Sequence, residues 1–125
     1  MKTNHHFSQS VEDYLEAIYM LGGQNVRSVD IANRLVVSRA SVNRAVNALM
    51  EKKMVSKMPY GAVSLTEYGL EISKKVENKH RILKRFLMEM LGVDEERANE
   101  EACGIEHDIS DDTAKRIAAL MRDKP

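Results

Sequence analysis

The stretch that decides the fold is residues 28–52, SVDIANRLVVSRASVNRAVNALMEK. Apolar residues recur at helical spacing in two blocks of it, 29–35 and 39–52. The four residues from Val36 to Arg39 leave room only for a tight turn, in which Ser38 caps the second helix. We therefore expect two short helices joined by that turn. The side chains that the second helix should bury are Val42, Val46, Leu49 and Met50.

The residues that follow change to the two-residue period of a β-hairpin. Val55 and Lys57 alternate on one side of Met58-Pro59-Tyr60-Gly61, and Val63 and Leu65 alternate on the other. Proline and glycine supply the turn between them. A helix-turn-helix followed by a small hairpin is the layout of a winged helix, whose second helix enters the major groove of DNA.

The solvent side of that second helix decides whether DNA binding follows. It carries no acid before Glu51. Arginine reads guanine edges or phosphates, asparagine suits adenine, and serine takes phosphate. The candidate DNA-binding residues are Arg39, Ser41, Asn43, Arg44 and Asn47, with Lys57 at the base of the wing. The alternative is a helical hairpin whose polar face meets only solvent, because each of these residue types is common on surfaces.

Helical patterns fill the rest of the chain, so the predicted fold class is mainly α. One covers Val11–Leu21 with Ser10 as its cap, and the longest begins after Thr66 and ends at Gly92. Asp94 opens another helix that reaches about His107, and Ser110 caps the last.

Charge is balanced over the 125 residues, with 19 basic and 19 acidic side chains, but it is unevenly placed. Residues 1–75 hold ten bases and seven acids, whereas residues 76–125 hold nine and twelve. The single cysteine excludes an internal disulfide, and no apolar run has the length of a signal peptide or of a membrane span. We expect a modestly basic half, an acidic half, and a cytoplasmic location.

Metal-ligating side chains gather in the acidic half. Cys103, Glu106 and His107 stand at i, i+3 and i+4, which places a thiol, a carboxylate and an imidazole on one helical face. These are donors for a first-row transition metal. Further donors stand on other helices at His80, Asp13 and Glu16. Spacing alone does not bring these helices together.

Each donor also has a purely structural interpretation. Asp13 stands three residues after Ser10 and could act only in a capping box. A lone cysteine in a helix is often a small buried hydrophobe. His80 could be a hydrogen-bonded core histidine, and Glu106 and His107, which follow a run of acids, could face water.

Together these patterns resemble one family, the metal-dependent transcriptional repressors typified by the diphtheria toxin repressor and the manganese transport regulator. The resemblance covers essentially the whole chain after the first ten residues. It runs through EDYLEAIY (12–19), DIA (30–32), SV (41–42), LTEYG (65–69), KHR (79–81) and EACGIEHDIS (101–110).

The resemblance implies a homodimer that binds a double-stranded DNA operator. Residues 1–74 would form the winged helix-turn-helix domain and residues 75–125 a helical metal-binding and dimerisation domain, with metal between them as co-repressor. Carried over by position, the ligands fall on Asp13, Glu16, His80, Cys103, Glu106 and His107. The first two match manganese-type members and the cysteine matches iron-type members. The expected ion is Mn²⁺ or Fe²⁺, with Zn²⁺ possible.

The resemblance also bears on a second ion and on chain length. Iron-type members place ancillary ligands where this chain has Lys84 and Asn99, which are poor ligands, so we expect no such site in that form. A second ion could share Glu16, His80 and Glu106 in the manganese-type manner. The chain stops before the SH3-like domain of longer members, as expected of the short form.

The expected function is metal-dependent repression of metal-ion homeostasis genes. One alternative is a winged-helix regulator that needs no metal. Another is a small metalloenzyme built around the donors of residues 103–107, although the sequence has no HExxH, phosphate loop or nucleophile motif.

Overall fold

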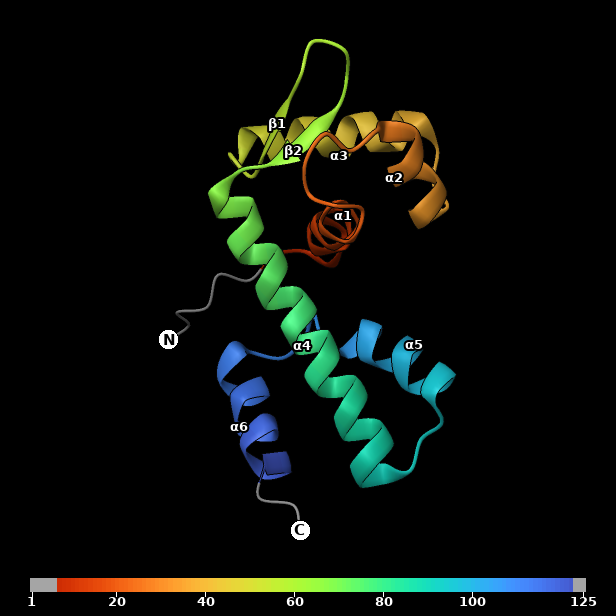
Figure 1. Cartoon of the computed structure of the whole chain (residues 1–125), viewed down its shortest axis with the longest axis vertical. Helices are drawn as coiled ribbons and strands as arrows, with labels where there is room; N and C mark the ends of the chain where they lie inside the picture. Colours follow the sequence, from red (N-terminus) through yellow and green to blue (C-terminus); the bar gives the residue numbers. More distant parts are fainter. Residues whose placement is uncertain (1–6, 123–125) are drawn as a thin grey trace. The chain divides into compact units, whose positions relative to one another are not determined.

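The computed structural model describes residues 7–122 as helices and one small hairpin (Figure 1). The elements in order are α1 (Gln9–Met20), α2 (Ser28–Leu35), α3 (Arg39–Glu51), β1 (Val55–Lys57), β2 (Val63–Leu65), α4 (Glu67–Leu91), α5 (Glu95–Ile105) and α6 (Asp111–Arg122). The chain forms two compact units that divide inside α4. The N-terminal unit is Ser8–Lys74, and the C-terminal unit is built from residues 75–122. The mainly α fold class is confirmed.

Helices α1, α2 and α3 enclose the core of the N-terminal unit. On these three helices, the least exposed side chains are Leu15, Ile18, Ile31, Val42, Val46 and Leu49. Between α2 and α3, Val36 adopts the left-handed conformation at φ 56°, which reverses the chain within a few residues. Ser38 then caps α3, because its Oγ accepts a hydrogen bond of 3.0 Å from the Ser41 amide. The predicted helix-turn-helix is confirmed.

The wing is an antiparallel pair with Val55 opposite Leu65 and Lys57 opposite Val63. It is not isolated, since Val26 and Val63 exchange two backbone hydrogen bonds of 2.8 Å. This bridge fixes the hairpin to the segment that leads into α2. The predicted hairpin is confirmed.

Three local predictions need correction. The cap of α1 is Ser8, whose Oγ accepts from the Val11 amide at 3.2 Å, and not Ser10. Met50 is 40% exposed, because Val46 and Leu49 already fill the inner side of α3. Helix α5 ends at Ile105 rather than near His107, where a turn closes with a hydrogen bond of 2.8 Å from the Asp108 amide to the Ile105 carbonyl.

In the C-terminal unit, α5 and α6 lie on either side of the C-terminal half of α4 (Figure 1). Leu83 and Leu87 of α4 pack on Ala98 and Ala102 of α5, whose short side chains permit close approach of the two helices. The residues that complete this core are Phe86, Val93, Ile109 and Ile117.

The predicted end of α4 and the predicted starts of α5 and α6 are confirmed. Gly92, at φ 71°, terminates α4. Asp94 accepts a hydrogen bond from the Arg97 amide at 3.1 Å and so caps α5, and Ser110 accepts from the Thr113 amide at 3.0 Å and so caps α6. No helix among residues 7–122 is long and apolar enough to span a membrane.

Candidate nucleic-acid interface and metal centre

Helix α3 presents a polar face opposite its buried one. Arg39, Asn43, Arg44 and Asn47 are exposed, and Ser41 is half-buried. Arg44 donates a hydrogen bond of 3.2 Å to Ser41 Oγ, and that oxygen also accepts one of 3.0 Å from Ser38 Oγ. The sixth candidate for DNA contact, Lys57, is exposed on β1. All six side chains are therefore available to a partner on the surface of the N-terminal unit.

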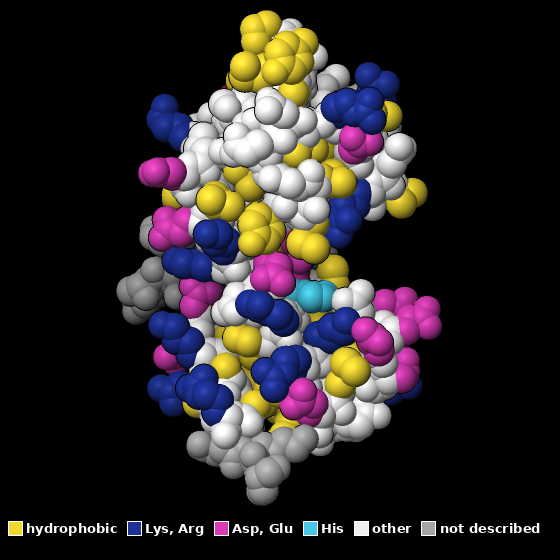
Figure 2. Space-filling model, in the orientation of Figure 1, with side chains coloured by type: hydrophobic (Ala, Val, Ile, Leu, Met, Phe, Trp, Pro, Cys, Tyr) yellow, Lys and Arg dark blue, Asp and Glu magenta, His cyan; other side chains and the backbone are white. Residues whose placement is uncertain are grey.

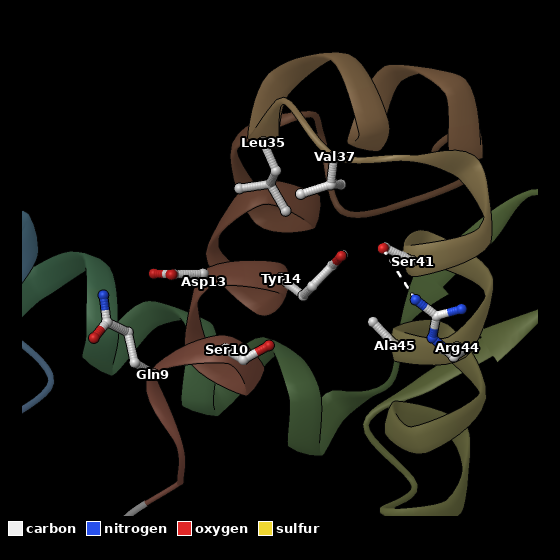
Figure 3. A pocket seen from close by; sticks show the side chains of 9 residues that line it. All are labelled: Gln9, Ser10, Asp13, Tyr14, Leu35, Val37, Ser41, Arg44 and Ala45. Atoms are coloured by element: carbon white, nitrogen blue, oxygen red, sulfur yellow. Dashed lines mark hydrogen bonds between the residues drawn. The ribbon is translucent and has the colours of Figure 1, made fainter.

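A pocket of about 640 Å³ lies among α1, the end of α2 and α3 (Figure 3). Asp13 and Tyr14 line it from α1, while Ser41 and Arg44 line it from α3. Tyr14 is only 8% exposed, so the same side chain belongs to the core and to the pocket wall. A candidate metal ligand and two candidate DNA contacts thus border one space. A shift of α1 would therefore change the position of Tyr14 relative to Ser41 and Arg44 of α3.

The two candidate ligands of α1 stand one turn apart. Asp13 and Glu16 are both half-buried, on the side of the helix away from Leu15 and Ile18, which are fully buried. Two carboxylates at this spacing repel each other unless a cation or hydrogen-bond donors compensate them.

The C-terminal unit holds a carboxylate between two imidazoles, which we call the His–Glu cluster: His80, Glu106 and His107. His80 Nδ1 lies 2.8 Å from Glu106 Oε1, and His107 Nε2 lies 3.5 Å from Glu106 Oε2. Glu106 is fully buried and His107 is 2% exposed. Among the described residues, no donor makes a hydrogen bond to Glu106 Oε2. A buried carboxylate oxygen of this kind is costly unless it is compensated, and a divalent cation meets that need.

His80 has a further contact, with Nε2 at 2.8 Å from Asn99 Oδ1. A neutral imidazole donates from only one ring nitrogen, so oxygen neighbours on both require a second proton or a turned amide. Coordination of one nitrogen to a metal would leave the other for Asn99 or Glu106, which is how metal-bound histidines are usually oriented. Sequence reasoning treated Asn99 only as a poor ligand and missed this contact.

Lys84, the other residue expected to be a poor ligand, also has a partner. Lys84 Nζ lies 3.2 Å from Glu95 Oε2. Cys103 is exposed on α5, one turn before Glu106. Among the candidate ligands of the C-terminal unit, the structure brings His80, Glu106 and His107 together.

Two family models match the chain. The iron dependent repressor N-terminal DNA binding domain matches residues 6–63, and the iron dependent repressor metal binding and dimerisation domain matches residues 66–124. The chain belongs to this family of metal-dependent transcriptional repressors. The matched domains assign DNA binding to the winged helix and metal binding and dimerisation to the helices that follow.

Known proteins agree with the family assignment. The repressor is 39% identical over 117 residues to the uncharacterized HTH-type transcriptional regulator MJ0568 of Methanocaldococcus jannaschii, covering 91% of this chain and 94% of that one. It is 36% identical over 115 residues to the HTH-type transcriptional regulator MntR of Bacillus subtilis, covering 90% and 80%.

Among solved structures, the repressor resembles a manganese-dependent transcriptional repressor in complex with manganese. The TM-score is 0.81 at 29% identity, over 91% of this chain and 53% of that one. The repressor therefore spans about half the length of that protein. The family consists of DNA-binding transcriptional regulators, so the metalloenzyme alternative is not supported.

Proposed function

We propose that the protein is a homodimeric repressor that requires Mn²⁺ or Fe²⁺ to bind a double-stranded operator of metal-ion homeostasis genes in the cytoplasm. The observation that carries the proposal is the His–Glu cluster, a fully buried carboxylate flanked by two imidazoles in the part of the chain matched as metal-binding. Residues 1–74 would serve DNA binding, and residues 75–125 metal binding and dimerisation.

The side chains that would hold the ion are Asp13, Glu16, His80, Cys103, Glu106 and His107. When bound, a divalent cation supplies positive charge to carboxylates that otherwise repel one another. The donors come from both units, two from α1 and four from the chain after Lys75. We propose that this shared ligation couples α1 to the dimerisation domain.

Inside the N-terminal unit, the packing supports a route from α1 to DNA. Tyr14, Leu15 and Ile18 of α1 are buried in the same core as the inner face of α3. The pocket that Asp13 shares with Ser41 and Arg44 lies along this contact. Fixing α1 would fix α3, and with a second subunit two α3 helices would meet adjacent major grooves.

The choice of ion follows from a mixed donor set. Carboxylates at Asp13 and Glu16 favour Mn²⁺, whereas a thiolate at Cys103 favours softer ions such as Fe²⁺ or Zn²⁺. The likeness to a manganese-dependent repressor supports Mn²⁺. Replacing Asp13 by Met would remove one hard oxygen donor, and the metal response should then move toward Fe²⁺.

The decisive experiment is a binding titration with a duplex that the wild-type protein selects from a random-sequence pool in the presence of Mn²⁺. We expect Mn²⁺ or Fe²⁺ to tighten binding by about 5- to 150-fold relative to chelated protein, the usual range for coupling between sites. Equal affinity with metal and with chelator would contradict the proposal and would favour a winged-helix regulator that needs no metal.

A further inference from the structure

Lys79 is a buried charged residue of the C-terminal unit that is not among the proposed metal ligands. It stands in α4 directly before His80 and is only 8% exposed. Figure 2 shows many lysine and arginine side chains on the surface of the molecule, where water solvates their charge. Lysine is rarely buried unless its ammonium group is paired, because removing that charge from water is costly. The partners of Lys79 therefore indicate what its side chain does.

Two acceptors of the Lys79 ammonium group lie where α5 is connected to α6. Its Nζ donates a hydrogen bond of 3.1 Å to the Ile109 carbonyl oxygen. The same Nζ lies 3.6 Å from Asp111 Oδ1, in the first turn of α6. We call the connection between the two helices, residues 106–110, the ligand turn, because it begins with Glu106 and His107. Lys79 thus holds the far end of the ligand turn against α4.

The near end of the ligand turn is held by the residue that follows Lys79. His80 Nδ1 lies 2.8 Å from Glu106 Oε1. Consecutive residues of α4 therefore contact the first and the fourth residues of the ligand turn. His107 stands between these two contacts and is 2% exposed. A side chain whose segment is restrained on both sides keeps a narrow range of positions, as a metal ligand requires.

Other contacts of the ligand turn do not fix its backbone to α4. Ser110 Oγ accepts a hydrogen bond of 3.0 Å from the Thr113 amide, and the Ser110 carbonyl accepts one of 3.1 Å from the Ala114 amide. Both of these bonds join the turn to α6. The Ile109 side chain packs on the core between α4 and α5, but apolar packing is non-directional and satisfies no carbonyl oxygen. The hydrogen bond from Lys79 fixes the backbone at that point.

We propose that Lys79 is a positioning residue of the metal centre, whose ammonium group holds the ligand turn where Glu106 and His107 can bind an ion. The inference rests on the proposed function for its metal, but the restraint on the turn exists without metal. If the ammonium group were absent, the turn would sample more conformations, and binding of the ion would have to order it. The buried charge thus preorganises the ligands and does not itself bind the ion.

The test compares two lysines of α4. Lys79→Met keeps the length and the apolar stem of the side chain but removes the ammonium group. Lys75→Met makes the same change at an exposed position of the same helix. Calorimetric titration with Mn²⁺ should show about tenfold weaker binding by Lys79→Met, at the lower end for outer partners of metal ligands, and no change for Lys75→Met. Circular dichroism of the chelated proteins verifies that both variants are folded.

Two further readouts separate positioning from general damage. With Mn²⁺ in excess, Lys79→Met should bind the selected duplex as tightly as the wild type, because no candidate DNA contact is changed. Only the Mn²⁺ concentration at which binding is half-maximal should rise. Lys79→Arg, which keeps a cation with N–H donors, should lie closer to the wild type than Lys79→Met in Mn²⁺ affinity.

Hydrogen exchange tests the restraint without metal, because it reports how often a backbone hydrogen bond opens. The Asp108 amide donates to the Ile105 carbonyl at 2.8 Å inside the ligand turn. In chelated Lys79→Met it should exchange about tenfold faster than in the wild type, as for loss of one hydrogen bond to a charged group. The Ala98 amide, which donates to the Asp94 carbonyl at 2.8 Å at the start of α5, should exchange as in the wild type.

The inference is overturned if Lys79→Met binds Mn²⁺ as the wild type does, if its Asp108 amide exchanges at the wild-type rate, or if the Ala98 amide is accelerated equally. It is also overturned if Lys79→Arg is no better than Lys79→Met. A wild type that binds no Mn²⁺ would contradict the proposed function instead. In that case the exchange rates still decide whether Lys79 holds the ligand turn.

Discussion

The two units keep their functional side chains in opposite places. In the N-terminal unit, the polar residues of α3 are exposed and its core is apolar. In the C-terminal unit, Glu106 and His107 are among the most deeply buried side chains, alongside aliphatic ones. A surface that reads DNA can tolerate water when no partner is bound. A buried carboxylate is costly unless it is compensated. The stability of the C-terminal unit should therefore depend on the cation or hydrogen-bond donors that compensate Glu106.

The strongest test of this contrast is Glu106→Gln. Glutamine keeps the size of the side chain but removes the charge, so we expect the Mn²⁺ response of DNA binding to be lost, up to the full ~100-fold of the coupling. The matched control is Glu101→Gln on α5, where the carboxylate is half exposed and lies 3.8 Å from Arg97. Operator titrations with and without Mn²⁺ should show loss in the first variant only. A metal response retained by Glu106→Gln would remove the cluster from the mechanism.

The next test concerns packing in the N-terminal unit. A Cβ on Gly69 would overlap the Met54 carbonyl oxygen, a backbone atom that cannot rotate away. Gly69→Ala should therefore lower the free energy of unfolding by about 3 kcal/mol, at the upper end for overpacking. Thermal denaturation followed by circular dichroism measures this. An unchanged melting temperature would show that α4 can move away from the start of the wing at little cost.

These residues also show how far sequence alone could reach. The turn and cap signals at Ser38, Gly92, Asp94 and Ser110 are local, and each led to a correct helix boundary. The cap of α1 was misplaced by two residues because Ser8 and Ser10 offer the same chemistry and neither is part of the apolar pattern.

Only part of the candidate site could be predicted from the sequence. The types of donor could be named from spacing and resemblance. The burial of Glu106 and the His80–Asn99 contact could not be predicted, because both depend on how α4 packs against α5. His80 and Asn99 are 19 residues apart in the sequence. The turn at residues 58–61 was predicted from proline and glycine, but the exposure of Tyr60 could be determined only from the structure, in which β1 and β2 are paired.

A smaller effect is expected from Asn99→Ala. Loss of the oxygen that holds His80 Nε2 should free the ring to rotate and should weaken Mn²⁺ affinity by about 10- to 100-fold, as for other outer partners of metal-bound histidines. Asn78→Ala is the control, since Asn78 accepts a hydrogen bond from Arg81 on the exposed side of α4. Calorimetric titration with Mn²⁺ compares the two. Equal affinities would mean that Glu106 alone orients the imidazole.

The smallest expected effect is a gain in stability from Gly104→Ala. Gly104 lies inside α5, a Cβ there would meet no atom within 4 Å, and its φ is not positive. Alanine should restrict the unfolded chain and raise the free energy of unfolding by about 0.5–1 kcal/mol, opposite in sign to Gly69→Ala. Denaturation of chelated protein measures this without a contribution from metal. If the variant is instead destabilised, another part of the protein must lie against Gly104. The expected contrast between the open Gly104 and the enclosed Gly69 would then be wrong. If the gain appears, the same variant with Mn²⁺ asks whether stiffening the turn before Glu106 also alters the metal response.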